Sequence, residues 1–301
     1  MRDRRAKKGF LGTVRRACNL PVRYGLTPVK VLKQLQLMVD TARRADCLPT
    51  IGVTAANLDR HPRISSGLAG LDLVVHGYQH VGYGSLSDEE QARDLDLARN
   101  AFSAVGLRAS GFRAPYLDTN SSTLRLLRDR GFAFDSSLPH VALPAESESR
   151  SAVLKHALSR YGPVEMNLQN PYMESDLVEL PVGLPDDELL IDAMGLRNPE
   201  LILRVLTSML THTANENSLL VLQIHPERFS LFAAAIREIL SKTSDMGGWK
   251  TNLTELAAWI RIHHGFSQRW PHGQTFALAL TGDLDALTLT DFGGRLWPKI
   301  A

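Results

Sequence analysis

The chain has 301 residues, of which 44% are hydrophobic and 22% are charged, and its formal net charge is +2. These values are ordinary for a soluble globular protein and leave room for one large domain or two small ones. So small a net charge gives no reason to expect nucleic acid as a partner. No apolar run approaches the roughly 18–20 residues that a membrane-spanning helix requires, so no transmembrane segment is expected.

Basic residues are concentrated at the start of the chain, in Arg2, Arg4, Arg5, Lys7, Lys8, Arg15 and Arg16. We expect residues 1–22 to form a solvated, partly flexible segment, with an anionic partner such as a lipid surface or a phosphorylated carrier as the alternative. The segment lacks the uninterrupted apolar core of a secretory signal, so a cytoplasmic protein is the default expectation. With only Cys18 and Cys47, neither a disulfide framework nor a cysteine-rich zinc site can be built, and we expect Cys47 to be buried as a thiol.

Helices and strands are predicted to alternate through the rest of the chain. Thr27 as a cap and Pro28 in the first turn predict a helix to about Arg44. Ser87 and Glu90 have the spacing of a capping box, which predicts a helix to about Val105. Further helices are expected near residues 121–130, 152–160, 200–212, 229–240 and 254–263. Apolar runs predict strands at residues 48–54, 71–75, 111–112, 132–134, 177–180, 219–224 and 276–280.

This alternation implies a parallel sheet, and about seven such units favour a barrel over an open sheet. Residues 136–176 are expected to form a loop-rich excursion. No Gly/Ser linker, clear repeat or low-complexity tract marks a boundary. We therefore predict an α/β fold in which residues 23–301 form a single (β/α) barrel domain.

Polar clusters follow four of the predicted strands directly. They are His76 with His80, Arg113, His225, and Asp283 with Asp285. If the strands are parallel, their carboxyl ends open on one face, where barrel enzymes place their chemistry. Two histidines and one aspartate with an open coordination position are typical of a catalytic zinc site.

Four segments resemble the motifs of the NodB-type polysaccharide deacetylases, carbohydrate esterase family 4. The segments are His76-Gly-Tyr-Gln-His80, Phe112-Arg113-Ala-Pro115-Tyr116, Ile224-His225-Pro226 and Thr281-Gly-Asp283-Leu-Asp285. The resemblance covers about Arg23 to Asp291. It implies a distorted, seven-stranded NodB-like barrel and a hydrolase that removes an N-acyl group, most often acetyl, from an amino sugar or polysaccharide.

By this resemblance a divalent metal, usually zinc, would be held by Asp285, His76 and His80. Asp283 would be the general base, kept ionised and oriented by Arg113. The backbone N–H of Tyr116 would stabilise the oxyanion, and His225 would protonate the departing amine. General physical chemistry supports the same roles, because a base is needed where the proton leaves and donors where negative charge develops.

Other residues in or beside these motifs are candidates for substrate contact. They are Tyr78, Pro115 and Asp118, with packing at the rim of the site as the alternative. The family also uses an acidic group to tune the catalytic histidine. The nearest candidate is the acidic stretch at residues 185–188, which a solvated loop would explain as well.

The order of the motifs departs from that of the family, because the aspartate motif stands on the last strand and not on the first. The sequence looks circularly permuted, with the displaced strand at residues 275–285. A barrel closes on itself, so its first and last strands are neighbours and the site can survive such a change. The alternative is that this stretch begins a second, truncated domain. Asp283 and Asp285 would lie about 6.6 Å apart on one side of a strand, which leaves open which is the base and which the ligand.

Two other functions stay open at this point. The same site could hydrolyse another non-peptide C–N bond, such as that of a ureide or a formamide, or the barrel could bind carbohydrate without catalysis. The sugar, the acyl group, the metal and the oligomeric state are not indicated by the sequence.

Overall fold

The computed structural model describes residue 20, residues 23–265 and residues 270–296. Apart from Leu20, the predicted basic segment at residues 1–22 lies outside the described residues, as does Cys18. The strands are β1 (Thr50–Val53), β2 (Asp72–Val75), β3 (Gly111–Phe112), β4 (Phe134–Asp135), β5 (Pro139–Val141), β6 (Tyr172–Glu174), β7 (Leu177–Glu179), β8 (Val182–Leu184), β9 (Leu219–Gln223), β10 (Gly248–Thr251) and β11 (Phe276–Leu284).

The α-helices are α2 (Val29–Arg43), α3 (Ala56–Arg60), α4 (Ser65–Leu68), α5 (Asp88–Ala104), α6 (Ser121–Asp129), α7 (Arg150–Arg160), α8 (Pro199–Asn215), α9 (Phe229–Asp245), α10 (Leu253–Ile262) and α11 (Leu289–Leu296). Short 3-10 turns are η2 (Pro62–Ile64), η3 (Tyr83–Ser85), η4 (Pro115–Leu117), η6 (Pro226–Arg228) and η7 (Pro271–Gly273), and η5 (Leu189–Ala193) is a π-helical turn.

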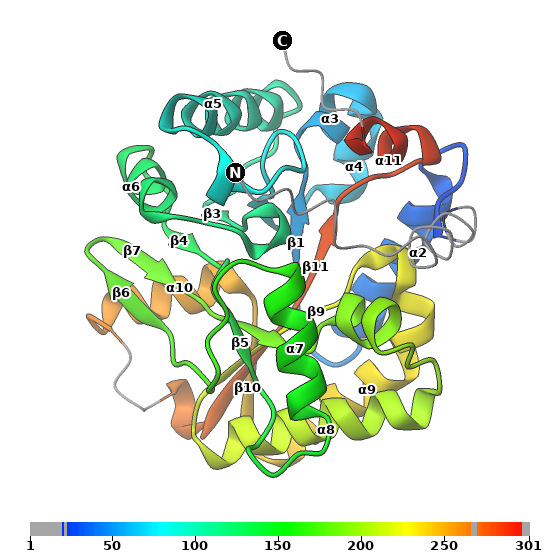
Figure 1. The fold of residues 1–301 in the computed structure, drawn as a ribbon, viewed down its shortest axis with the longest axis vertical. Coiled ribbons are helices and arrows are strands. Elements are labelled where there is room, and N and C mark those ends of the chain that lie inside the picture. The colour runs from blue at the N-terminus through cyan, green and yellow to red at the C-terminus, as the bar shows by residue number, and fades with distance from the viewer. Residues whose placement is uncertain (1–19, 21–22, 266–269, 297–301) are drawn as a thin grey trace.

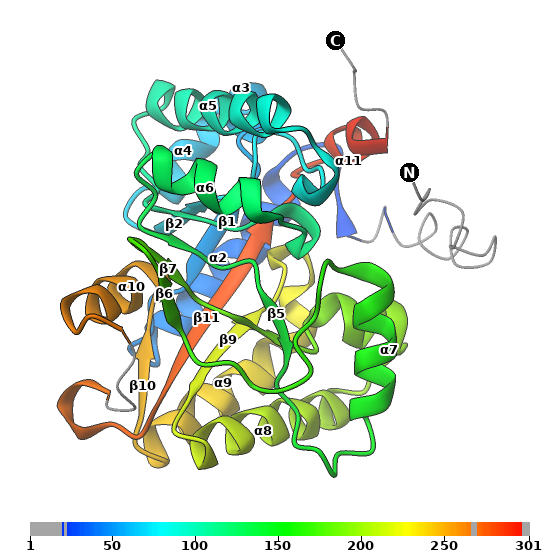
Figure 2. The same ribbon diagram turned by 60° about the vertical axis from the view of Figure 1, so that its left-hand side comes forward.

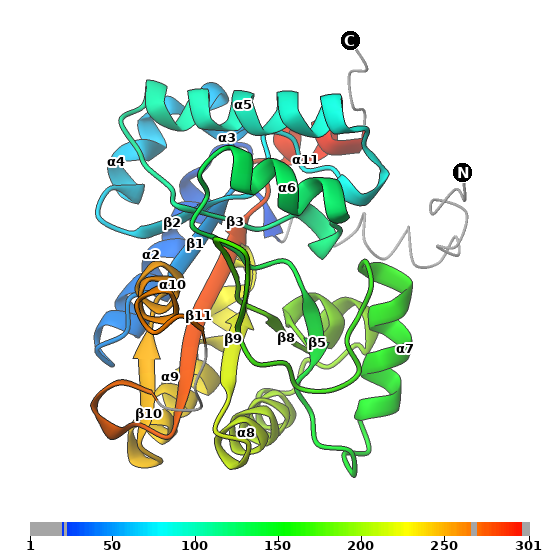
Figure 3. The ribbon, with the colours of Figure 1, turned by 90° about the vertical axis from the view of Figure 1, so that its left-hand side faces the viewer.

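The strands form one curled sheet in the order β5-β8-β9-β11-β1-β2-β3-β4-β7-β6, with β10 paired to β11. Every pairing between these strands is parallel except that of β6 with β7. Helices surround the sheet, with α3, α5 and α6 gathered at one end of the molecule and α8 and α9 at the other (Figure 1, Figure 3). This architecture is the distorted (β/α) barrel that the sequence predicts.

Strand β11 lies at the centre of the sheet although it is the last strand of the chain (Figure 2). Its nine residues are all buried, and it pairs with β9 on one side and with β10 and then β1 on the other. The expectation that this strand folds beside the strand near residues 48–54 is therefore confirmed. A circularly permuted barrel would place the strand here, and the permutation itself stays a hypothesis.

Local sequence signals account for where several helices begin. Ser87 accepts from the backbone N–H of Glu90 while the Glu90 side chain accepts from that of Ser87, so the predicted capping box begins α5. Asn120 and Thr123 form a second capping box at the start of α6. The expected Thr27 cap is wrong, because α2 begins after Pro28 with no side-chain cap hydrogen bond.

Four strands were not predicted, namely β5, β6, β8 and β10. The first three are only three residues long, and prolines stand in or beside β5 and β8, which removes the long apolar run that signals a strand. The predicted strand at residues 132–134 is observed as β4, shifted toward its carboxyl end. Residues 136–176 are thus less irregular than expected.

Burial elsewhere follows the predicted pattern. Cys47 is buried, and burial raises the pKa of its thiol to about 11. In the described part of the chain no helix combines the length and the apolar character needed to span a membrane.

Candidate active site

A pocket opens where several parallel strands end, and it brings together most of the predicted site residues. It is lined by His76, His80, Ala114, Tyr116, Leu117, Tyr161, Asp186, Glu188, Gln223, His225, Asp283 and Asp285. Apart from Tyr161, which follows α7, these side chains come from the ends of β2, β3, β8, β9 and β11 and from the loops that follow them. Residues as far apart in sequence as His76 and Asp285 therefore meet at one place.

His76, His80 and Asp285 form a cluster of buried groups that could hold a metal ion, with ligand atoms within 4.8 Å of one another. The Nε2 atoms of His76 and His80 lie 3.3 Å and 3.1 Å from the two carboxylate oxygens of Asp285. His76 Nδ1 lies 2.8 Å from the carbonyl oxygen of Arg113, to which it would donate, leaving Nε2 free for a cation. Ligand atoms in a tetrahedral zinc site lie roughly 3.4 Å apart, given bonds of about 2.1 Å, so the donor set fits such an ion.

The loop that carries the two histidines is held by Asp94 of α5. Its carboxylate accepts hydrogen bonds from the backbone N–H groups of Tyr78 and Gln79 and from the hydroxyl of Tyr83. Gly77 permits the turn, since its φ is +68° and an added Cβ would lie 2.8 Å from the carbonyl oxygen of Gln79. Burial raises the pKa of Asp94, and the three hydrogen bonds oppose that change by favouring the ionised form.

Asp283 is fully buried and receives donors from two sides. Gln223 Nε2 donates to Asp283 Oδ2 over 2.8 Å, and Arg113 Nη1 lies 3.5 Å from Oδ1. Thr281 and Asp283 lie on one face of β11, as the two-residue period of a strand requires, and Asp285 follows directly after the end of the strand. Within this arrangement Asp285 belongs to the histidine cluster, whereas Asp283 stands beside it, with Oδ2 4.0 Å from His76 Nε2.

Arg113 is fully buried and is fixed mainly by neutral oxygen atoms. Its guanidinium donates to the hydroxyl of Thr281 at 2.8 Å and to the backbone oxygen and hydroxyl of Ser136 at 3.0 Å and 2.8 Å. Because these hydrogen bonds hold the guanidinium in one orientation, its positive charge stays beside Asp283.

Tyr116 follows Arg113 in a turn of unusual backbone geometry. Its φ is 59° and that of Leu117 is 48°, values that non-glycine residues seldom adopt and that are found at functional sites. The Tyr116 ring is 44% exposed and meets the His80 ring edge-on, with centroids 4.5 Å apart. The ring thus forms part of the wall at the pocket mouth.

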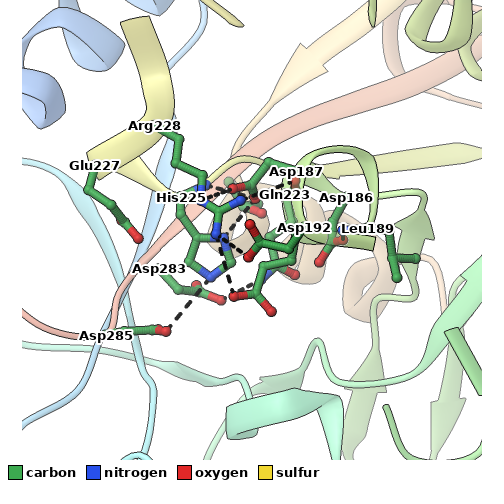
Figure 4. Close-up of polar contacts among 12 residues, drawn as sticks. Asp186, Asp187, Leu189, Asp192, Gln223, His225, Glu227, Arg228, Asp283 and Asp285 are labelled. Carbon is green, nitrogen blue, oxygen red and sulfur yellow. Dashed lines mark hydrogen bonds and ion pairs between the residues drawn. The ribbon is translucent and has the colours of Figure 1, made fainter. Parts of the chain in front are cut away.

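His225 lies on the other side of the pocket and pairs with Asp187 (Figure 4). Its Nδ1 lies 2.7 Å from Asp187 Oδ1, and Nε2 faces Asp285 Oδ2 at 3.9 Å. Burial disfavours the charged ring, but the Asp187 carboxylate outweighs it and the pKa of His225 is raised well above its usual value. Burial likewise opposes ionisation of Asp187, while His225 and then Arg228 outweigh it and lower the pKa of that carboxyl.

Asp187 lies in the acidic stretch predicted to supply the partner of His225, and its neighbour Asp186 faces the pocket. Asp186 accepts from the hydroxyl of Tyr161 at 2.5 Å and from the backbone N–H of Leu189 at 2.9 Å. Burial, followed by repulsion from Asp187 and Glu188, raises the pKa of Asp186 to about 7. Although Asp186 and Asp187 are consecutive, Asp187 therefore pairs with His225 and Asp186 lies at the pocket beside Tyr161.

The candidate substrate contacts lie at the edge of this arrangement, outside the residues that line the pocket. The Tyr78 hydroxyl donates to Asp59 at 2.9 Å. Pro115 is buried at the start of η4. Asp118 is buried, and its carboxylate fills the space where glycines 82 and 84 have no side chain.

Sequence reasoning missed Gln223, Asp94, Tyr161 and Ser136. Gln223 is the one polar residue of the otherwise apolar strand β9, and it stands at the end of that strand, two residues before His225. That spacing is a signal that could have identified it. The other three lie on separate elements and carry no motif.

Comparisons with known proteins agree with the motifs. Residues 36–134 match the family model described as polysaccharide deacetylase. The peptidoglycan deacetylase-like protein FGM2 of Gibberella zeae is 37% identical over 71 residues, which are 23% of this chain and 21% of that protein. The match therefore spans about a fifth of the length of that curated relative.

Solved structures share the fold. A putative polysaccharide deacetylase from Mycobacterium smegmatis is 22% identical with a TM-score of 0.61, and the alignment covers 79% of each chain. A structure titled Puue allantoinase is 15% identical with a TM-score of 0.57, covering 78% of this chain and 74% of that one.

Proposed function

We propose, from the premise that this chain belongs to the polysaccharide deacetylase family, that it is a metal-dependent hydrolase that removes an N-acyl group, with acetyl the first candidate, from an amino sugar. The observation that carries the proposal is the cluster of His76, His80 and Asp285 beside a second buried carboxylate and opposite a histidine. The amino-sugar substrate is supported by the motifs and by the name of the curated relative.

A divalent cation, with zinc the first candidate, would be held by His76, His80 and Asp285. When bound, it would polarise the acyl carbonyl and lower the pKa of a water molecule. The chain's own groups would do the rest. Asp283 would accept the proton of the attacking water, because hydrogen bonds from Arg113 and Gln223 hold its carboxylate in position.

His225 would donate a proton to the departing amine, and Asp187 would keep the ring in the orientation and tautomer required. The Tyr116 backbone N–H would stabilise the negative charge that develops on the carbonyl oxygen. A general acid and a general base on opposite sides of the pocket are what hydrolysis of an unactivated amide requires, since the amine leaves only when protonated.

The first test is metal analysis together with acetate release from N-acetylglucosamine oligomers. Chelation should abolish turnover, and adding back Zn²⁺, Co²⁺ or Mn²⁺ should restore it. Asp283→Asn should lower kcat by about 10²–10⁴-fold while the metal content is unchanged, because it removes the base and leaves the three ligands. Asp129→Asn on the surface is the matched control.

An Asp283→Asn variant with full activity, or a wild-type protein that turns over after complete metal removal, would refute the proposal. Parallel assays on ureides and formamides would show whether a different C–N bond is the substrate.

A further inference from the structure

Gln223 has an atom that the proposed chemistry does not use. The side chain is 5% exposed and lines the pocket. Its Oε1 is buried, and within the part of the chain that the structure describes it has no hydrogen-bond partner. Buried polar atoms without a partner are rare in native proteins, because leaving one unsatisfied costs free energy.

The orientation of this amide follows from its neighbour. Gln223 Nε2 donates a hydrogen bond to Asp283 Oδ2 over 2.8 Å. The NH₂ group must therefore face Asp283, so Oε1 faces away from that carboxylate. Gln223 is also the nearest donor to Asp283, since the Arg113 contact is 3.5 Å long.

Gln223 stands between the two groups that exchange protons with the substrate. It contacts Asp283 directly, and it stands at the end of β9, two residues before His225, which lines the same pocket (Figure 4). A scissile amide placed between the base and the acid presents one N–H at this position. An ester presents only oxygen lone pairs there, which would oppose those of Oε1.

We propose that Gln223 Oε1 accepts a hydrogen bond from the N–H of the scissile amide and makes the site selective for N-acyl over O-acyl groups. This inference rests on the proposed hydrolase function and adds to it the class of bond that the site prefers. A site built to pair with a substrate N–H discriminates strongly against an analogue that lacks it, because its own polar group is then left unpaired.

The test uses two substrates that differ only at the scissile atom, 7-acetamido-4-methylcoumarin and 4-methylumbelliferyl acetate. The quantity measured is the ratio of their kcat/KM values in the metal-loaded full chain. Gln223→Met keeps the length of the side chain and removes both of its hydrogen bonds. Both substrates should react more slowly because Asp283 loses its donor, and the amide-to-ester ratio should fall by about tenfold or more.

Two controls separate this effect from damage to the fold. Leu222→Met, on the same strand but outside the residues that line the pocket, should leave the ratio and the metal content unchanged. The wild-type protein should also hydrolyse the N-methylated amide, which lacks the N–H, at least tenfold more slowly than the parent amide. Gln223→Met should show a much smaller difference between these two amides.

An unchanged amide-to-ester ratio in Gln223→Met would overturn the inference. If the rates for the amide and the ester both fell by the same factor, Gln223 would only position Asp283. A wild-type protein that hydrolyses the N-methylated amide as fast as the parent amide would overturn it without any variant. No turnover of either substrate by the wild type would overturn the proposed function as well, which distinguishes the two failures.

Discussion

Gly52→Ala should disable the site while leaving the fold intact. Gly52 of β1 is in register with Asp283 of β11, and a Cβ at this position would lie 2.2 Å from Asp283 Oδ1. Real Cβ atoms do not approach closer than 3.0 Å, so the carboxylate oxygen must move by at least 3.0 − 2.2 = 0.8 Å. That shift would disturb the 2.8 Å hydrogen bond from Gln223 and the 3.5 Å contact with Arg113.

The size of the effect follows from the sensitivity of catalysis to geometry. A misplacement of about 1 Å costs about 10²-fold in rate, so we expect kcat to fall about 30–100-fold, which corresponds to about 2–2.7 kcal/mol. The clash is with the end of a side chain and leaves the three candidate metal ligands in place, so the metal content should change little. The disturbed hydrogen bond should lower the melting temperature by no more than a few degrees. The assay is kcat on an N-acetylated amino sugar, with metal content and thermal unfolding measured in parallel.

Gly67→Ala is the matched control. A Cβ at Gly67, on the short helix α4, meets nothing within 4 Å, and alanine favours the helix. This variant should retain full activity. Gly52→Ala with a kcat within threefold of wild type would refute the placement of Asp283 as a base held in a tightly defined position.

Two further changes test groups outside the proposed metal ligands. Asp187→Asn should lower kcat by about 10²-fold with little change in metal content, because it removes the carboxylate that lies 2.7 Å from His225 Nδ1 and orients the ring. Unaltered steady-state kinetics in this variant would contradict that role. The second change concerns two buried carboxyls: burial raises the pKa of Asp135 to about 6, and burial, followed by repulsion from Asp135, raises the pKa of Glu179. The folded state therefore binds more protons than the unfolded state between these raised pKa values and the ordinary ones. The free energy of unfolding should accordingly fall as pH rises from about 4 through 6. Glu179→Gln should lessen that fall, so that its melting temperature drops a few degrees less than that of the wild type between pH 5 and pH 8. Parallel curves for the two proteins would count against a raised pKa of Glu179.

The local pattern of the sequence was sufficient for the larger elements. The capping box predicted α5, and long apolar or amphipathic runs predicted α9, β9 and β11, because such signals involve residues close together in the chain. Strands β5, β6 and β8 were not predicted, because each is three residues long and lies at or beside a proline, which is too short a run to show the periodicity of a strand. Their formation depends on neighbours already in the sheet.

The sequence by itself also determined the chemistry available at each strand end: two histidines, a buried arginine, a third histidine and a pair of aspartates. Parallel strands bring their carboxyl ends to one face, so that convergence could be predicted without coordinates. The resemblance to the deacetylase family pointed to the acidic stretch at residues 185–188, but not to which of its carboxylates would turn toward His225.

Only the tertiary structure decided which of these groups contact one another. The pairing of Asp285 with the histidines, and of Asp283 with Gln223, depends on the register of β11 against β1 and β9. That register joins residues separated by 58 positions or more in the chain, and no local pattern encodes it. The role of Gly52 has the same origin, since its lack of a side chain matters only because β11 places a carboxylate opposite it.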